Sequence, residues 1–222
     1  MKNIRQKVVI IGAGGFGREV LDIFEAYNIE HNIWEIIGFV DDNPSLHDKK
    51  IRGYPVVGSV DWFCRKEAKD VKSVIAVGDN TVRQKIAKKA RENGAKFCNI
   101  IHPSVIKTEY IDFGEGIIVT AGCILTNNIK VGNHVIINLD VTVGHDTTID
   151  DFVNLNPGVH INGDNKILEG AFVGSGAVTI QGITIGKWSI LGAGAVVIKD
   201  IPDKVVAVGV PAVVKKLLER PD

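Results

Sequence analysis

The chain has 222 residues, and its 26 lysines and arginines balance its 26 aspartates and glutamates. A neutral balance argues against a nucleic-acid binder held by a basic surface, so we expect no nucleic-acid partner. No run of 18 or more apolar residues is present, so we expect no membrane insertion either. The three cysteines are scattered and form no C-x-x-C pair. Reduced thiols in a cytoplasmic protein are the expected consequence.

The first hundred residues alternate apolar runs with helical patterns, which is typical of a parallel sheet covered by helices. Residues 7–14 (KVVIIGAG) predict a buried strand that ends in glycines, and residues 81–94 predict a helix that stops at Gly94. The other expected elements are a helix at 16–28 and strands at 35–42 and 72–80. We therefore expect a small Rossmann-like α/β domain over residues 1–103.

A glycine-rich loop follows the first predicted strand. Residues 12–17 (GAGGFG) fit the pattern G-x-G-x-x-G between a strand and a helix, where glycines let the backbone approach a phosphate closely. Asp41 and Asp42 end the second strand, where an acid can bind a ribose hydroxyl. Taken alone, this pattern suggests NAD. A domain of about 100 residues, however, supplies few strands for a full dinucleotide fold.

From about residue 105 the pattern changes to a period of six. Starting at Phe113 and stepping by six to Val197, fourteen of fifteen positions are apolar, and only Thr179 departs. Small or β-branched side chains recur four places after many of these positions: Val135, Val141, Thr147, Val153, Val159, Ala171, Ala177, Ser189 and Ala195. Neither an α-helix nor an ordinary strand has this period, whereas a hexapeptide-repeat β-helix does.

Each hexapeptide is expected to form one side of a triangular coil, so that 18 residues complete one turn. Adjacent coils then stack at strand spacing, roughly 4.8 Å. We expect this parallel β-helix to occupy a second domain, residues 104–222. Residues 206–222 predict a strand, a turn marked by Pro211 and a short C-terminal helix that covers the open end.

The hexapeptide run, with LGAGAVVIKDIPD and VGVPAVVKK at its end, resembles the left-handed β-helix acyltransferases. With VVIIGAGGFGREV, GFVDDN and IAVGDN in front, the chain resembles those that acetylate bacterial sugars. These are the sialic-acid O-acetyltransferases and the nucleotide-sugar N-acetyltransferases similar to the bacillosamine and perosamine enzymes. The resemblance implies a left-handed β-helix and a homotrimer. It also implies that acetyl-CoA lies between two β-helices and that the first domain binds a nucleotide sugar.

His145 lies two residues after Val143, near a corner of the prism where a side chain points outward. The resemblance implies that this histidine, in the setting GHD, is the catalytic base and that Asp146 is its partner. The chemistry needs such a group, because an amine or hydroxyl must lose a proton as it attacks a thioester carbonyl. A neutral imidazole is a suitable proton acceptor near neutral pH.

The period places Gly163 one coil after His145, about 5 Å away at strand spacing. The resemblance implies that the Gly163 N–H holds the thioester oxygen and that Ser175 and Ala193 contact acetyl-CoA. Many relatives carry a second histidine nine places after the first, where this chain has Asn154. Asparagine can donate a hydrogen bond to the cofactor but cannot act as a base.

In the first domain, the resemblance places Gly14, Gly15 and Phe16 at the phosphates of the nucleotide sugar. It places Asp41 and Asp42 at the base or ribose and Gly78 at the end of the third strand. Some relatives have histidine where Phe16 stands, so a contact between that side chain and the phosphate is absent here. The remaining histidines lack the spacing of a zinc site on this fold, and we expect no metal.

The sequence therefore predicts an acetyl-CoA-dependent N-acetyltransferase that acts on a nucleotide-linked 4-amino-4,6-dideoxy sugar, with a UDP-linked sugar favoured, in bacterial surface glycan biosynthesis. O-acetylation of a sialic acid or related sugar is the alternative within the same family. A non-catalytic nucleotide-sugar sensor is the alternative of another class, and the presence of His145 argues against it. The nucleotide base, the sugar isomer and the pathway stay open.

Overall fold

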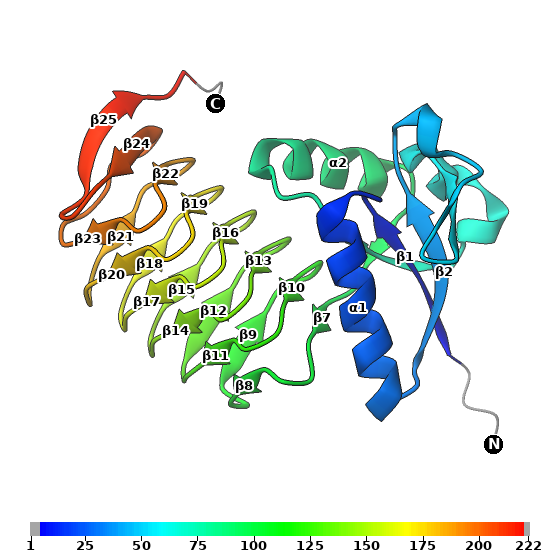
Figure 1. Cartoon of the computed structure of the whole chain (residues 1–222), viewed down its shortest axis with the longest axis horizontal. Helices are drawn as coiled ribbons and strands as arrows, with labels where there is room; N and C mark the ends of the chain where they lie inside the picture. Colours follow the sequence, from blue (N-terminus) through cyan, green and yellow to red (C-terminus); the bar gives the residue numbers. More distant parts are fainter. Residues whose placement is uncertain (1–4, 220–222) are drawn as a thin grey trace. The chain divides into compact units, whose positions relative to one another are not determined.

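The computed structural model describes residues 5–219. The chain divides between Pro103 and Ser104 into two compact units, each built on its own plan (Figure 1). The first is an α/β unit, and the second is a parallel β-helix.

The first unit contains a six-stranded sheet in the order β3-β4-β2-β1-β5-β6, parallel except for the antiparallel pair β3–β4. Its elements are β1 (Gln6–Ile11), α1 (Gly15–Glu30), β2 (Trp34–Val40), β3 (Lys50–Ile51), β4 (Tyr54–Gly58), β5 (Lys72–Ile75), α2 (Asn80–Glu92) and β6 (Lys96–Phe97). Three short 3₁₀ helices lie at Pro44–Leu46, Val60–Cys64 and Lys66–Ala68. The sequence patterns predicted β1, β2, β5 and both helices. They did not indicate β3, β4 or β6, which are short or lack a clear alternation.

Strand β1 lies between β2 and β5 in the sheet, and it is apolar because it is buried. Val8, Val9, Ile10 and Ile11 are buried, as expected for a strand inside a parallel sheet. Helix α1 packs close to this strand because of Gly17. A Cβ atom at Gly17 would lie 2.0 Å from the carbonyl oxygen of Gly12, so the last glycine of the motif allows the close helix–strand approach.

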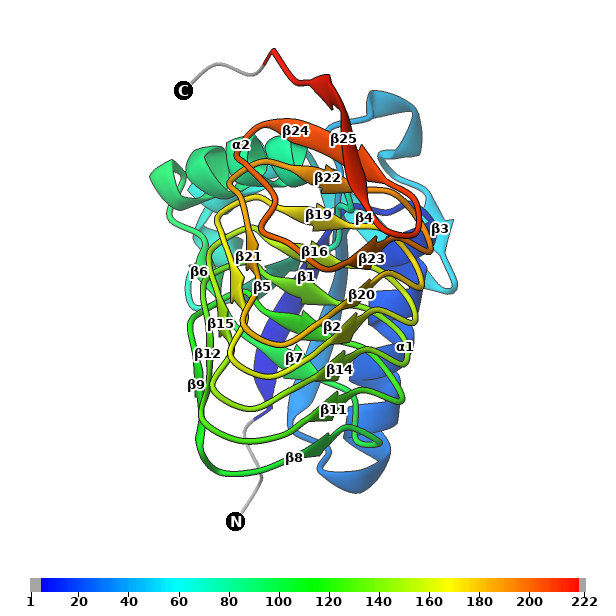
Figure 2. The same ribbon diagram turned by 90° about the vertical axis from the view of Figure 1, so that its left-hand side faces the viewer.

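The second unit is a prism with three faces (Figures 1 and 2). Face 1 is the sheet β25-β24-β22-β19-β16-β13-β10-β7, whose strand β7 precedes the division at Pro103 in the chain, face 2 is β23-β20-β17-β14-β11-β8, and face 3 is β21-β18-β15-β12-β9. The strands of face 1 are β7 (Ile100–Ile101), β10 (Ile118–Val119), β13 (Ile136–Ile137), β16 (Asn154–Leu155), β19 (Phe172–Val173), β22 (Ile190–Leu191), β24 (Val205–Val208) and β25 (Val213–Leu217). Those of face 2 are β8 (Ile106–Lys107), β11 (Ile124–Leu125), β14 (Thr142–Val143), β17 (His160–Ile161), β20 (Val178–Thr179) and β23 (Val196–Val197). Those of face 3 are β9 (Ile111–Phe113), β12 (Ile129–Val131), β15 (Thr148–Ile149), β18 (Lys166–Ile167) and β21 (Thr184–Ile185).

The strands pair in parallel with the strand one coil away, which confirms the predicted 18-residue coil. Thr142 pairs with His160 and Val143 with Ile161, for example. Every one of the fifteen period-six positions except Phe113 is buried, including the polar Thr179. Apolar side chains therefore fill the prism, and the β-helix expected from the repeat is confirmed.

The corners of the prism have a period of their own. Every sixth residue from Gly116 to Gly194 has a positive φ, between 54° and 78°. Half of these positions are glycine, and three are aspartate, which tolerates the left-handed region because its short side chain can bond locally. Asp146, with φ of 61°, is one of them. The turn conformation itself thus favours an aspartate directly after His145.

The short C-terminal helix expected after Pro211 is wrong. Val213–Leu217 instead form β25, which pairs antiparallel with β24 and extends face 1. The segment begins with two β-branched valines, which favour an extended backbone, and an unpaired strand edge is available beside it.

Within residues 5–219, no helix is long and apolar enough to cross a membrane. The three cysteines are all free thiols. The cytoplasmic location expected from the cysteine pattern stays a prediction.

Candidate active site

His145 and Asp146 occupy the turn between β14 on face 2 and β15 on face 3, and their side chains are 57% and 50% exposed. His145 Nδ1 lies 2.8 Å from Asp146 Oδ2. A carboxylate can only accept this hydrogen bond, so in the neutral imidazole the proton lies on Nδ1 and Nε2 is the acceptor. Among the described residues, none is hydrogen-bonded to Nε2. The pair is thus arranged as a base with its accepting nitrogen open.

Asn128 supports Asp146 from the preceding coil. Its side-chain amide donates to Asp146 Oδ1, while Oδ2 accepts from His145. The Asn128 hydrogen bond, followed by that of His145, lowers the pKa of the Asp146 carboxyl below its usual value. Asp146 is therefore ionised at neutral pH and available to orient the imidazole.

Gly163 lies directly beside the imidazole, as the 18-residue period predicted. A Cβ atom at Gly163 would lie 2.7 Å from His145 Nε2, so any other residue would displace the ring. No acceptor among the described residues takes a hydrogen bond from the Gly163 N–H. A proton acceptor and an unused N–H donor thus meet at one corner of the prism.

The other three residues predicted to contact acetyl-CoA lie away from His145 within the single chain. Ser175 and Ala193 lie in successive turns at the corner between faces 1 and 2. The two turns stack, and the N–H of Gly194 donates to the Ser175 carbonyl at 2.8 Å. Asn154 lies in β16 on face 1, and its side chain is buried. None of the three is at the His145 corner, and their contacts with acetyl-CoA stay predictions.

In the first unit, Gly14 is the N-cap of α1, and Gly15 and Phe16 begin the helix. Gly14 and Gly15 are exposed, and a Cβ atom at Gly14 would have no neighbour within 4 Å. The backbone of this turn is therefore open to a ligand, as a phosphate site requires. A Cβ atom at Gly78, in the loop between β5 and α2, would likewise have no neighbour within 4 Å.

The two carboxylates after β2 already bind the backbone. Asp41 Oδ2 accepts from the Ala13 N–H at 2.9 Å, which fixes the glycine loop. Asp42 Oδ1 accepts from the Val60 N–H at 2.8 Å. Both acids line a cavity of about 130 Å³ whose other walls are largely apolar, and the lining consists of Ile11, Gly12, Val40, Asp41, Asp42, Val60, Val77 and Ile86. The sequence indicated a ligand role for these acids but not their part in shaping the loop.

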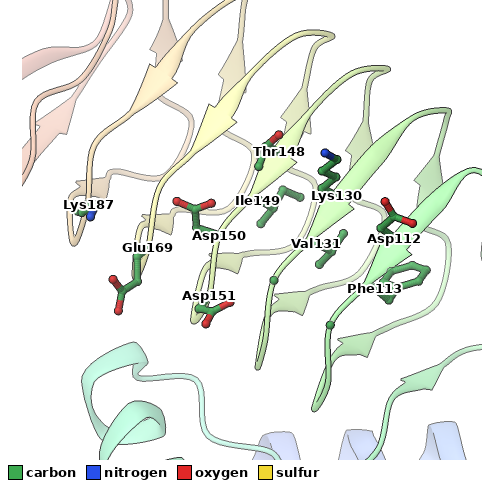
Figure 3. Close-up of a pocket in the computed structure, with 12 residues that line it drawn as sticks. Asp112, Phe113, Lys130, Val131, Thr148, Ile149, Asp150, Asp151, Glu169 and Lys187 are labelled. Carbon is green, nitrogen blue, oxygen red and sulfur yellow. The ribbon is translucent and has the colours of Figure 1, made fainter.

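A larger groove of about 580 Å³ runs along face 3, and it includes no predicted site residue. Figure 3 shows its charged side chains, four carboxylates and two lysines: Asp112, Asp150, Asp151, Glu169, Lys130 and Lys187. The excess of negative charge disfavours the phosphates of CoA here. Within residues 5–219, no group of three or more histidine, cysteine, aspartate or glutamate side chains could hold a metal ion.

Sequence reasoning missed Asn128, although a signal for it was present. It lies 18 residues before Asp146, so one step of the coil period places the two side chains together.

Comparison with known proteins extends this description. Residues 7–90 match the family model of the PglD N-terminal domain. The chain is 31% identical over 186 residues to GDP-perosamine N-acetyltransferase of Escherichia coli O157:H7, covering 83% of this chain and 82% of the relative. PerB from Caulobacter crescentus, solved in complex with CoA and GDP-perosamine, superposes with a TM-score of 0.86 at 36% identity, covering 95% of this chain and 97% of that one. The acetyltransferase domain of PglB from Neisseria gonorrhoeae, in complex with acetyl coenzyme A, gives 0.86 at 30% identity, covering 95% and 100%.

The identity and coverage extend over both units, and the coil architecture agrees with them. The chain belongs to the hexapeptide-repeat acetyltransferase family and is an acetyltransferase with the left-handed β-helix fold.

Proposed function

We propose that this protein transfers the acetyl group of acetyl-CoA to the 4-amino group of a nucleotide-linked 4-amino-4,6-dideoxy sugar, in the synthesis of a bacterial surface glycan. The observation that carries the proposal is the His145 corner. There, Nε2 is open, Nδ1 lies 2.8 Å from a carboxylate, and Gly163 lies against the ring. The relatives that act on perosamine, an amino sugar, support N-acetylation.

The neutral amine of the sugar attacks the thioester carbonyl carbon, and His145 Nε2 takes the proton that the nitrogen loses. The positive charge that forms on the imidazole is stabilised by Asp146, whose pKa is lowered by Asn128 and His145. The Gly163 N–H donates to the oxygen that becomes negative in the tetrahedral intermediate. Collapse of this intermediate breaks the C–S bond, and the proton held by His145 passes to the leaving sulfur, so that CoA leaves as the thiol and the imidazole is neutral again.

The amine attacks directly, without an acyl-enzyme. Burial raises the pKa of the Cys123 thiol to about 11 and that of Cys98 to about 12. Both thiols are therefore protonated at neutral pH, and thiols are poor nucleophiles in that form. The third cysteine, Cys64, lies in the 3₁₀ helix Val60–Cys64 of the first unit, whereas the His145 corner belongs to the second unit.

We propose that the enzyme acts as a homotrimer. Face 2 lies between the His145 corner and the Ser175 corner, and it exposes apolar side chains: Ile106 is 65% exposed and Ile124 is 39% exposed. Packing of this face against other copies would bury these side chains. Acetyl-CoA would then lie where the His145 corner of one copy meets Ser175 and Ala193 of the next.

The nucleotide sugar is assigned to the first unit. The open turn at Gly14, Gly15 and Phe16 receives its phosphates, with Gly78 at the same carboxyl edge of the sheet. Asp41 and Asp42 lie at the cavity beside β1 and β2, where the base or ribose fits. We retain the UDP-linked sugar predicted from the sequence. Because relatives act on or bind GDP-perosamine, a GDP-linked sugar is the main alternative substrate to compare with it.

The test measures CoA release from acetyl-CoA with UDP-, GDP- and dTDP-linked 4-amino sugars and with free sialic acid. The proposal expects rapid release with one aminated nucleotide sugar and an N-acetylated product. Release with sialic acid alone would assign the protein to O-acetylation. Absence of release with every acceptor would contradict the proposed substrate class.

A further inference from the structure

Two polar residues occupy the interior of the prism at positions where most coils have apolar ones. Thr179 is the single polar residue among the fifteen period-six positions. Asn165 occupies the position four residues after Ile161, where most coils have a small or β-branched residue. Both are buried, with relative exposures of 0% for Asn165 and 1% for Thr179. Buried polar groups destabilise a core unless they are hydrogen-bonded, so their presence needs a reason.

The two departures from the repeat are bonded to each other. Asn165 Nδ2 lies 3.1 Å from Thr179 Oγ1. Thr179 Oγ1 also accepts from the backbone N–H of Asn162, at 3.1 Å, and Asn165 Oδ1 accepts from the N–H of Ile183, at 2.9 Å. Together they form a polar network inside the largely apolar prism, and this network ends on the backbone of the turn that carries Gly163.

The Asn162 carbonyl is the group that the network holds most firmly. It accepts from Asn165 Nδ2 at 2.6 Å and from Thr147 Oγ1 at 3.3 Å, both of them buried side chains. This carbonyl belongs to the same peptide unit as the Gly163 N–H. In a planar trans peptide the C=O and N–H point in opposite directions. Because the carbonyl points into the prism, the N–H must point outward, on the surface where the His145 ring lies.

Other turns of the β-helix fix the same peptide differently. In five of them, the equivalent carbonyl accepts a backbone N–H from the residue three positions on: Asn156–Val159, Leu168–Ala171, Gly174–Ala177, Gly186–Ser189 and Gly192–Ala195. At Gly186 a buried serine hydroxyl, Ser189 Oγ, adds a second bond at 2.7 Å. At the Gly163 turn the carbonyl is held by side chains, so its orientation depends on Asn165.

We propose that Asn165, with Thr179, is a positioning residue for acetyl transfer. It locks the Asn162–Gly163 peptide so that the Gly163 N–H faces the reacting thioester oxygen beside His145. This inference rests on the proposed function, in which that N–H stabilises the oxyanion.

The test compares Asn165→Ala with Asn165→Ser. Both variants remove similar volume, but serine can keep the bond to the Asn162 carbonyl, as Ser189 does to Gly186. We expect Asn165→Ala to lower kcat about 10- to 100-fold, because an oxyanion donor contributes about 10²–10³ to kcat. The KM for acetyl-CoA should stay unchanged, since the donor acts in the transition state. Asn165→Ser should restore most of kcat.

Ser189→Ala is the matched control, because it removes the equivalent buried bond from a turn outside the proposed site. It should change the unfolding temperature but not kcat. Equal kcat for Asn165→Ala and Asn165→Ser, or wild-type kcat in Asn165→Ala, would overturn the inference. Where Asn165→Ala does not fold, Thr179→Val takes its place: a fall in kcat with unchanged KM supports the inference, and wild-type kcat overturns it.

His145→Ala, assayed in parallel, separates this inference from the proposed function. If His145→Ala keeps full activity, the proposed function fails, and the positioning role fails with it. If His145→Ala is inactive while Asn165→Ala is unimpaired, the proposed function stands and the positioning role alone is wrong.

Discussion

The two units of this chain encode their sites differently. In the β-helix, residues of the candidate site are spaced by the coil period of 18. Asn128 lies 18 residues before Asp146, and Gly163 lies 18 residues after His145. In the α/β unit, no repeat relates Gly14 to Asp41, and their relation follows from the sheet order.

Polar residues within the two patterns have different roles in the two units. In the prism, Asn165 and Thr179 occupy interior positions that are apolar in most coils, and both bond to the turn that carries Gly163. In the α/β unit, the motif acids are themselves structural, since Asp41 holds the Ala13 N–H. Substitutions of Asn165 or Thr179 should therefore change kcat, whereas those at Asp41 should change stability and substrate binding together.

The largest effect is expected for His145→Ala. Loss of the base should lower kcat by about 10²–10⁴, because proton transfer to a positioned side chain contributes that much. Steady-state CoA release measures it. His31→Ala is the control, since that side chain is also about half exposed and its ion pair is with Glu30 at 3.8 Å. An equal loss in both variants would argue against a specific role for His145.

Gly163→Ala should follow in size. The new methyl group would lie 2.7 Å from His145 Nε2, and the flexible imidazole would move aside. We expect kcat to fall about tenfold or more with little change in unfolding temperature, since a misplaced catalytic group is costly. Wild-type kcat in a folded Gly163→Ala variant would show that the ring position is not critical.

Asp41→Ala tests the opposite behaviour in the α/β unit. The N–H groups of Ala13 and Asn43 lose their acceptor, which should cost about 1–3 kcal/mol of stability. The loosened glycine loop should raise the KM for the nucleotide sugar while the KM for acetyl-CoA stays constant. Thermal unfolding and the two KM values measure this. A change in kcat alone would remove the distinction between the two units.

Asn128→Gly should have a smaller effect on activity. Glycine accepts the positive φ of 54° at this position, so the variant removes the amide without straining the turn. The pKa of Asp146 should rise toward its usual value, yet the carboxyl stays ionised above about pH 5. We expect kcat to fall a few-fold, by the same factor from pH 6 to 9. A loss that grows as the pH falls toward 6 would contradict this account, because it would show that the carboxyl becomes protonated in that range.

The smallest effect concerns two thiols, that of the partly buried Cys98 in the first unit and that of the buried Cys123 in the second. Because burial raises the pKa of Cys98 to about 12 and that of Cys123 to about 11, the reactive thiolate is scarce at pH 8. A thiol reagent should label the exposed Cys64 quickly and the other two after unfolding. Mass spectrometry of the labelled peptides measures this. Rapid labelling of Cys123 in folded protein would show that the prism opens.

The hexapeptide repeat predicted the prism, its coil length and the position of Gly163 beside His145. The α/β unit was predicted in outline, because β1 and both helices have clear patterns. The β3–β4 pair escaped prediction, since Lys50–Ile51 is too short to show alternation. The C-terminal strand escaped because the helix former Leu217 and the two lysines before it outweighed the valines in the pattern. The Asp146–Asn128 bond needs side-chain conformations, which spacing alone does not give.

The pH dependence of kcat/KM for the amino sugar tests the central claim most directly. If a neutral amine attacks while His145 accepts its proton, two groups must be unprotonated. The logarithm of kcat/KM should then fall with a slope approaching two at low pH in the wild type, and with a slope of one in His145→Ala. A slope of one in both proteins, with similar rates, would contradict the account, because the histidine would then take no part in the reaction.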